Sequence, residues 1–370
     1  MRILQVVSLI SPDGAFGGPV RVAVNQCGEL LRRGHDVKLA AATRGYAAPP
    51  AAIDGVPVQL FQARTVVPKT GFPGLTSPGL VRWVHANIRS FDVVHVHFGR
   101  DLMVLPVAAC VRRHGVPYVL QTHGMVTPSR HPLAVPLDAM WTRRLLSDSG
   151  AVLYLTEQER RQLGEVARAP LNLVHLENGV PEYPQATRDS PVPEVLFVAR
   201  MQARKRPLLF VEMAKALLAE GVQARFTLIG PDEGEGTAVR AAVAGETMIT
   251  WEGPLDPADV PRRLGRASLY VLPSVREPYP MTVLEAMAVG LPVVIAADCG
   301  LAPLVERAQA GVVVAGDAAA FADAVRTLLA DCAHARTIGE LARKAAQNDF
   351  GMCQIGDRLT RQYDEIRHGR

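Results

Sequence analysis

Cysteine is scarce in this chain of 370 residues, and no apolar run approaches the roughly 20 residues that span a bilayer. The five cysteines are widely scattered, with neither metal-ligand spacing nor a disulfide framework: Cys27, Cys110, Cys299, Cys332 and Cys353. We therefore expect small buried thiols in a reduced, cytoplasmic compartment. The N-terminal MRILQVVSLISPDG is too briefly apolar for a signal sequence and lacks a cleavage pattern, so we predict a buried first strand.

Familiar nucleotide and hydrolase motifs are also missing. No Gly-x-Gly-x-x-Gly follows an expected strand, no Gly-x4-Gly-Lys-Ser/Thr occurs, and no Gly-x-Ser-x-Gly elbow is present. These absences count against ordinary dinucleotide binding, P-loop phosphoryl transfer and a hydrolase triad.

The positive charge is concentrated in the first half of the chain. Residues 1–180 carry 19 Lys and Arg against 12 Asp and Glu, whereas residues 181–370 carry 21 against 24. A basic first half suits phosphorylated substrates or an acidic membrane surface, and a solvated basic face without a partner is an equal alternative. The candidate membrane patch consists of Arg112, Arg113, Arg143 and Arg144 with Trp83 and Trp141.

The apolar pattern predicts two doubly wound α/β domains. Val/Ile/Leu-rich runs alternate with helical segments, stop at the Pro-rich polar stretch over 178–193, and then restart. We predict two Rossmann-like domains facing across a cleft, over 1–180 and 181–351, with a final helix near 352–370 packed back on the first. The expected strands are 3–10, 35–42, 56–61, 92–98, 116–123, 151–156, 172–178, 194–200, 224–230, 248–253, 267–274 and 291–297.

The stretch REPYPMTVLEAMAVGLP (276–292) predicts a phosphate-binding helix end. A proline in the first turn and Gly-Leu-Pro at the end bound a helix over 281–289. Free N–H groups of Met281, Thr282 and Val283 would then form an anion site that suits a pyrophosphate. Loops that follow parallel strands are where such sheets bind ligands.

Two glutamates eight residues apart, Glu277 and Glu285, flank that helix start. Both carboxylates can accept hydrogen bonds from sugar hydroxyls. An alternative explains them equally well: Glu277 is a solvated loop residue, and Glu285 interacts with the helix dipole. EPYPMTVLEAMAVGLPVV closely resembles the Glu-x7-Glu signature of the retaining, family-4-type glycosyltransferases, which have the GT-B fold. The resemblance implies that Glu277 contacts the donor-sugar hydroxyls and Glu285 the nucleotide ribose. Pro280 stands at the family's usual glycine and removes one backbone donor.

VLFVARMQARKRP (195–207) is similar to the family's Gly-Arg-Leu-x3-Lys-Gly element. The match implies that Arg200 and Lys205 neutralise the donor diphosphate, which accumulates charge as the glycosidic bond breaks. Ala199 and Arg206 replace the element's two glycines. With Arg204 and Arg206 beside the lysine, the choice of the acting cation stays open.

The resemblance also covers the first half, where GAFGGPVRVAVNQCGELLRRGHDV (14–37) matches the family's opening. It implies that a Gly17-Gly18 turn lets the backbone approach donor phosphate and acceptor. His123, at the end of an expected strand, matches a histidine that hydrogen-bonds the donor sugar. Three further residues fall in loops that border the nucleotide base: Gly230, Gly253 and Pro254.

The resemblance therefore implies a retaining glycosyltransferase that moves a hexose from a UDP- or GDP-sugar to a hydroxyl acceptor. The acceptor would be a sugar, glycolipid or lipid-linked glycan in bacterial surface polysaccharide or glycolipid synthesis, reached from the cytoplasm or the inner membrane face. No metal or other cofactor and no nucleic acid is implied. The alternatives are a soluble glycoside product, a GT-B epimerase or hydrolase, and a non-catalytic sugar-nucleotide-binding protein.

Overall fold

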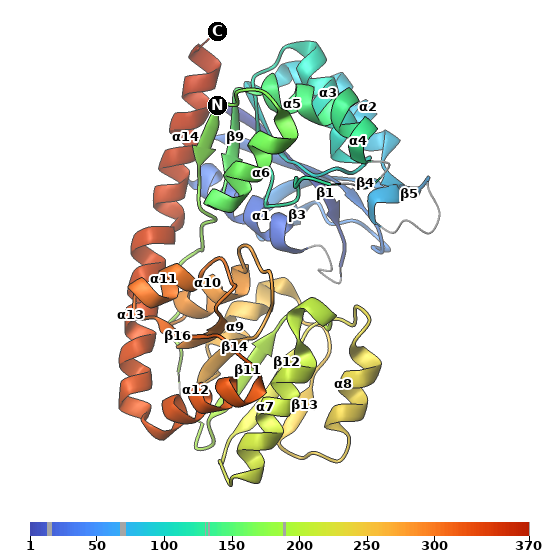
Figure 1. Cartoon of the computed structure of the whole chain (residues 1–370). Coiled ribbons are helices and arrows are strands. Elements are labelled where there is room, and N and C mark those ends of the chain that lie inside the picture. Colours follow the sequence, from blue (N-terminus) through green and yellow to red (C-terminus); the bar gives the residue numbers. More distant parts are fainter. Residues whose placement is uncertain (13–16, 67–71, 130, 132–133, 188–189, 370) are drawn as a thin grey trace. The chain divides into compact units, whose positions relative to one another are not determined.

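The computed structural model describes residues 1–12, 17–66, 72–129, 131, 134–187 and 190–369 (Figure 1). The chain forms two compact units, Met1–Gly179 with Met352–Arg370, and Val180–Gly351. The division falls one residue before the boundary that we placed after residue 180. The last helix, α14 (Met352–His368), belongs to the first unit, where it packs on α1 (Gly17–Arg32).

The first unit is built on an eight-stranded sheet in the order β10-β9-β8-β7-β1-β2-β4-β3. Its neighbouring strands are parallel, apart from the antiparallel pair β3 and β4. The strands are β1 (Arg2–Ile10), β2 (Asp36–Thr43), β3 (Ala52–Ile53), β4 (Val56–Gln62), β7 (Val93–His97), β8 (Tyr118–Gln121), β9 (Ala151–Tyr154) and β10 (Leu173–His175). A small antiparallel pair, β5 (Arg64–Thr65) and β6 (Leu75–Thr76), lies outside this sheet.

Helices cover both faces of this sheet because successive strand side chains point to opposite faces. Along β1, Ile3 and Val7 join a core with α1 and α14, whereas Leu4 and Val6 join a second core with α2, α3, α5 and α6. The bounds of these last four helices are α2 (Pro78–Asn87), α3 (Val104–His114), α5 (Arg143–Ser147) and α6 (Glu157–Ala167). The remaining helical segments of this unit are η1 (Phe72–Gly74), η2 (Ile88–Ser90), α4 (Ala134–Leu137) and the π-helical η3 (Asp138–Thr142).

The second unit has a fully parallel six-stranded sheet in the order β13-β12-β11-β14-β15-β16. Its strands are β11 (Glu194–Val198), β12 (Arg225–Ile229), β13 (Ile249–Trp251), β14 (Leu269–Leu272), β15 (Val293–Ala296) and β16 (Gly311–Val314). Its helical segments are η4 (Ala203–Lys205), α7 (Pro207–Ala219), α8 (Gly236–Val243), η5 (Pro257–Asp259), α9 (Val260–Leu264), α10 (Met281–Ala288), α11 (Ala302–Arg307), α12 (Ala318–Ala330) and α13 (Cys332–Phe350). The predicted doubly wound α/β fold is thus confirmed in each unit.

The strand order of the second unit reverses between β11 and β14, which are hydrogen-bonded neighbours. Loops at such a reversal diverge above the carboxyl ends of the strands and leave room for a ligand. The two loops here are 199–206 and 273–280; the first contains Arg200 and Lys205, and the second contains Glu277.

Candidate functional site

Glu277 is a buried, paired carboxylate in the loop between β14 and α10. Lys205 Nζ donates to Glu277 Oε2, and Arg204 Nη2 lies 3.8 Å from the same oxygen. The side chains of Glu277 and Lys205 are only 9% and 12% exposed. The interpretation of Glu277 as a solvated loop residue was therefore wrong, because its charge is held in a largely desolvated ion pair.

The backbone around Glu277 is fixed by a neighbouring loop. Arg276 adopts φ 50°, and its N–H donates to Asp298 Oδ2 at 2.9 Å. Gly300 N–H donates to the Glu277 carbonyl at 2.8 Å, and a Cβ on Gly300 would lie 1.8 Å from the Pro278 carbonyl oxygen. Only glycine fits there, so Asp298 and Gly300 are supporting residues that sequence reasoning missed.

Lys205 lies in a crowded basic environment. Burial lowers the pKa of Lys205, the Glu277 carboxylate opposes that shift, and the charges of Arg204 and Arg200 add to it. The next residue, Arg206, has φ 54° and ψ 49°, the left-handed conformation that glycine adopts most easily. This backbone geometry explains physically why the family element has glycine at that position.

Arg200 is also paired. Its Nη1 lies 2.7 Å from both carboxylate oxygens of Glu233, which follows β12. The cation that sequence reasoning assigned to the diphosphate thus has a carboxylate partner, Glu233, that sequence reasoning did not single out.

The N-terminus of α10 differs from our expectation at one residue. The N–H of Val283 donates to the Pro280 carbonyl at 3.1 Å, so the prediction that this N–H is free was wrong. The cause is Pro280 at the N-cap, whose extended ψ of 110° turns its carbonyl toward the third helical residue. Within the described residues, no backbone carbonyl accepts from Met281 or Thr282, as is usual for the first helical N–H groups.

The interior side chains of α10 are buried. Glu285 is 4% exposed. The Thr282 hydroxyl lies 2.7 Å from the hydroxyl of Tyr270, which is itself 3.2 Å from the Val198 carbonyl. This contact joins the start of α10 to β14 and to the end of β11.

Two of the predicted base-bordering residues meet at the carboxyl edge of the sheet. Gly230 N–H donates to the Gly253 carbonyl at 2.8 Å, and Trp251 Nε1 donates to the Gly230 carbonyl at 2.9 Å. Gly230 has φ 141°, and a Cβ there would lie 2.0 Å from the Ala199 carbonyl oxygen. A larger residue at Gly230 would therefore clash with the backbone of Ala199. Pro254, which follows Gly253, is exposed.

In the first unit, His123 follows β8 with φ 50° and is joined to a buried polar chain. His123 Nε2 lies 2.7 Å from His97 Nδ1, and His97 Nε2 lies 3.0 Å from Gln5 Oε1. The Gln5 amide nitrogen donates to Tyr363 Oη at 3.4 Å, and this hydroxyl lies 2.7 Å from His95 Nδ1.

This chain fixes the tautomer of His123. Since Gln5 Oε1 can only accept, His97 carries its proton on Nε2 and its Nδ1 accepts from His123 Nε2–H. His123 Nδ1 is then left with a lone pair. Burial lowers the pKa of His123 to about 3 and that of His97 well below its usual value, so both rings are neutral at pH 7. His123 is thereby an acceptor for a hydroxyl.

Glu159 of α6 binds the residues on both sides of His123. Its Oε1 accepts from Thr122 Oγ1 at 2.5 Å and from Gly124 N–H at 2.6 Å, and its Oε2 accepts from Leu155 N–H at 2.7 Å. The sequence did carry a signal, because Thr156 is the helix N-cap and Thr-x-x-Glu is a capping pattern. Sequence reasoning overlooked it.

The glycine pair lies in a different structure from the one expected. Gly17 and Gly18 form the first turn of α1, and Gly18 does not adopt a positive φ, so the prediction of a glycine turn was wrong here. The helix α1 begins at Gly17, so both glycines are helical. The preceding residues 13–16 lie outside the described residues.

Three residues of the candidate membrane patch make contacts within the first unit, whereas Arg113 and Arg144 are exposed. Arg112 pairs with Asp148 at 2.5 Å, and Arg143 Nε donates to the Val166 carbonyl at 3.0 Å. Trp83 packs beside Phe61, with ring centroids 5.8 Å apart. Among the described residues, no helix combines the length and apolar character needed to cross a membrane.

Two Rossmann-like units with parallel sheets define the GT-B class of fold. Solved structures agree: a sucrose-phosphate synthase from Thermosynechococcus elongatus covers 100% of both chains with a TM-score of 0.76 and 21% identity. The Anabaena protein HepE, crystallised with UDP and glucose, covers 98% of this chain and 99% of its own with a TM-score of 0.74 and 18% identity.

Sequence comparison gives the family. Residues 17–179 match the model of a glycosyl transferase 4-like domain, and residues 192–331 match that of glycosyl transferases group 1. An alpha-D-kanosaminyltransferase of Streptomyces kanamyceticus is 26% identical over 327 aligned residues, which cover 80% of this chain and 84% of that protein. A D-inositol 3-phosphate glycosyltransferase of Xylanimonas cellulosilytica is 29% identical, with 95% and 92% covered. The chain belongs to the family-4-type glycosyltransferases of the GT-B fold.

Proposed function

We propose that the protein transfers a hexose from a UDP- or GDP-sugar to a hydroxyl acceptor with retention of anomeric configuration. The observation that carries this proposal is the buried Lys205–Glu277 pair, in the two loops at the strand-order reversal. The N-terminus of α10 begins four residues after Glu277. A cation, a helix N-terminus and a carboxylate so arranged suit a phosphate ester that carries sugar hydroxyls.

In the proposed reaction, Lys205, Arg200 and the first N–H groups of α10 bind the donor diphosphate. They stabilise the negative charge that grows on it as the bond to the anomeric carbon breaks. Glu277 accepts from hexose hydroxyls and Glu285 from the ribose. The acceptor oxygen bonds to the anomeric carbon on the face that the diphosphate leaves, and a departing phosphate oxygen takes the acceptor proton. No protein nucleophile and no metal are assigned to these steps.

His123 contributes a neutral acceptor nitrogen for a hydroxyl of the bound sugar. Its tautomer is set by His97 and Gln5, and burial lowers its pKa to about 3, so the neutral ring presents Nδ1 as an acceptor. We assign it a positioning role in sugar binding.

We place the acceptor on the first unit, whose surplus of basic residues suits an anionic compound. A sugar, glycolipid or lipid-linked glycan of a surface polysaccharide pathway is the proposed class, with the enzyme in the cytoplasm or on the inner membrane face. A soluble phosphorylated polyol is the second candidate, because several relatives are named for transfer to D-inositol 3-phosphate.

The test is a screen of UDP- and GDP-hexoses for binding and slow hydrolysis, followed by transfer assays with lipid-linked glycans and with inositol 3-phosphate. The anomeric coupling constant of the product, measured by NMR, reports retention or inversion. We expect one nucleotide to bind and one sugar to be transferred with retention. An inverted product would refute the mechanism, and equal turnover by Glu277→Ala would refute the site.

A further inference from the structure

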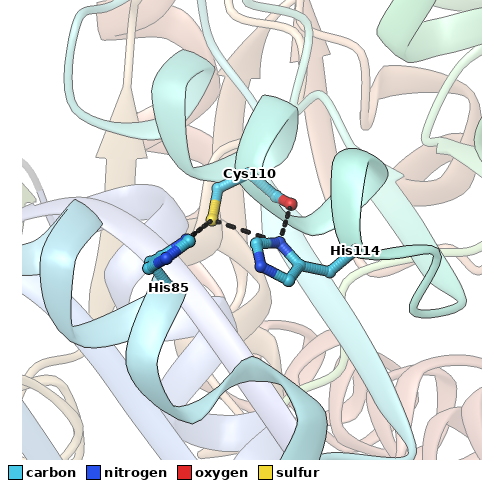
Figure 2. Close-up of side chains that lie close together, drawn as sticks. All are labelled: His85, Cys110 and His114. Atoms are coloured by element: carbon cyan, nitrogen blue, oxygen red, sulfur yellow. Dashed lines mark hydrogen bonds between the residues drawn. The ribbon is translucent and has the colours of Figure 1, made fainter.

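We propose that His85, Cys110 and His114 form a binding site for a zinc-class divalent cation in the first unit. Figure 2 shows the three side chains converging from α2 and α3. One ligand atom from each lies within 4.8 Å of the others, and Cys110 Sγ is 3.9 Å from His85 Nδ1. Nothing in the proposed transfer reaction uses these residues.

The helices explain why the three residues meet. Cys110 and His114 are four residues apart on α3 and therefore lie one above the other on one helix face. His85 lies in the last turn of α2, which packs against α3. Cysteine spacing alone gave no hint of this site, because two of its three ligands are histidines and one comes from another helix.

The donor set fits a tetrahedral cation. Zn–S and Zn–N bonds of roughly 2.3 and 2.0 Å place the two ligand atoms about 3.5 Å apart in a tetrahedral site. The separation of Cys110 Sγ and His85 Nδ1 is only a few tenths of an ångström longer. His114 Nδ1 lies 2.8 Å from the Cys110 carbonyl oxygen, to which it donates, so Nε2 carries the lone pair. Such a carbonyl partner commonly orients a metal-binding histidine.

The electrostatics also favour a cation. His85 and His114 lie in the last turns of α2 and α3, where helix dipoles place partial negative charge. Metal binding would displace the thiol proton. His85 is exposed, so the site is reachable from solvent, and water can take the fourth position.

The test is a Co²⁺ titration of the untagged, reduced full-length protein, followed by the thiolate-to-cobalt absorption band. We expect one Co²⁺ per chain and displacement of the band by Zn²⁺. His85→Gln removes a single ligand and should weaken Co²⁺ binding at least about tenfold. Because His85 is exposed, we do not expect this variant to misfold. Cys110→Ser should abolish the band.

Cys332→Ser is the matched control, because Cys332 is an exposed free thiol in the second unit, and it should keep the band. Absence of a thiolate band in the wild type at tenfold excess Co²⁺ would overturn the proposal. A Co²⁺ affinity of His85→Gln equal to that of the wild type would also overturn it, as would loss of the band in Cys332→Ser.

Discussion

Replacing Lys205 by Met and Glu277 by Gln should change nucleotide affinity in opposite directions. The two side chains form a buried ion pair, so a diphosphate that takes Lys205 as a ligand must compete with Glu277. Under the proposed function, Lys205→Met removes a cation that binds the diphosphate. Glu277→Gln removes its competitor and a negative charge close to the phosphates.

The size of each effect follows from the contacts. Hydrogen bonds to charged groups contribute about 1.5–3 kcal/mol, so Lys205→Met should weaken UDP or GDP binding about 10- to 150-fold. Glu277→Gln should increase that affinity severalfold, because it removes the carboxylate that competes with the diphosphate for Lys205. Turnover should fall in both variants. In Lys205→Met the leaving diphosphate loses a stabilising cation. In Glu277→Gln the neutral amide accepts from sugar hydroxyls more weakly than the carboxylate, by about 1 kcal/mol or roughly fivefold.

The assay is isothermal titration calorimetry with UDP and GDP on both variants and on the double variant, together with turnover of the preferred nucleotide sugar. Lys215→Met is the matched control, because Lys215 is 44% exposed and pairs with Glu246 on the same unit. Thermal unfolding checks that each variant is folded. In Lys205→Met, Arg204 lies 3.8 Å from Glu277 and should help to keep that carboxylate paired. Wild-type affinity in Lys205→Met, or equal weakening in Glu277→Gln, would refute the reasoning.

Three further predictions concern stability. Glu159→Ala removes the acceptor of three short hydrogen bonds, two beside His123 and one at the start of α6, and should lower the free energy of unfolding by about 2–4 kcal/mol in urea titrations, whereas Glu165→Ala should not. Arg206→Gly should raise the free energy of unfolding by about 0.5–1 kcal/mol, because Arg206 has φ 54°, which glycine adopts at lower cost. A destabilised variant would contradict this. His95 has a pKa of about 3 in the folded chain and about 6.5 in the unfolded chain, so the unfolded state binds more protons between these two pH values. The free energy of unfolding should therefore fall as the pH drops below 6.5, by up to about 1.4 kcal/mol per pH unit for each such histidine. His97→Gln should show a shallower acid profile than the wild type in unfolding titrations at pH 7, 6 and 5.

The fold was predictable because its signals are local and repeated. Strand-like apolar runs alternating with helices predicted two parallel sheets, and the polar Pro-rich stretch predicted the boundary that lies after Gly179. The start of α10 was also predictable, because Pro280 marks it. The Val283 N–H was mispredicted because the cap carbonyl's direction depends on ψ, which residue types do not fix.

The supporting residues of the site could not be predicted in the same way. Glu233, Asp298 and Gly300 act through contacts with distant loops, and nothing in their own neighbourhood marks them. Glu159 had a capping signal, but that signal predicts a helix start and not the two bonds to Thr122 and Gly124 beside His123. Which distant residue a side chain contacts depends on how the elements pack, and a single sequence does not show that packing.

The two cations assigned to the diphosphate share a property that bears on mechanism. Arg200 is paired with Glu233, and Lys205 with Glu277. The two cations repel each other, and each carboxylate offsets that cost locally. A diphosphate can replace this compensation because it brings its own negative charge. When it does so at Lys205, Glu277 gains acceptor capacity for sugar hydroxyls, so diphosphate binding and sugar orientation become one linked event. The opposite responses predicted for Lys205→Met and Glu277→Gln test that linkage directly.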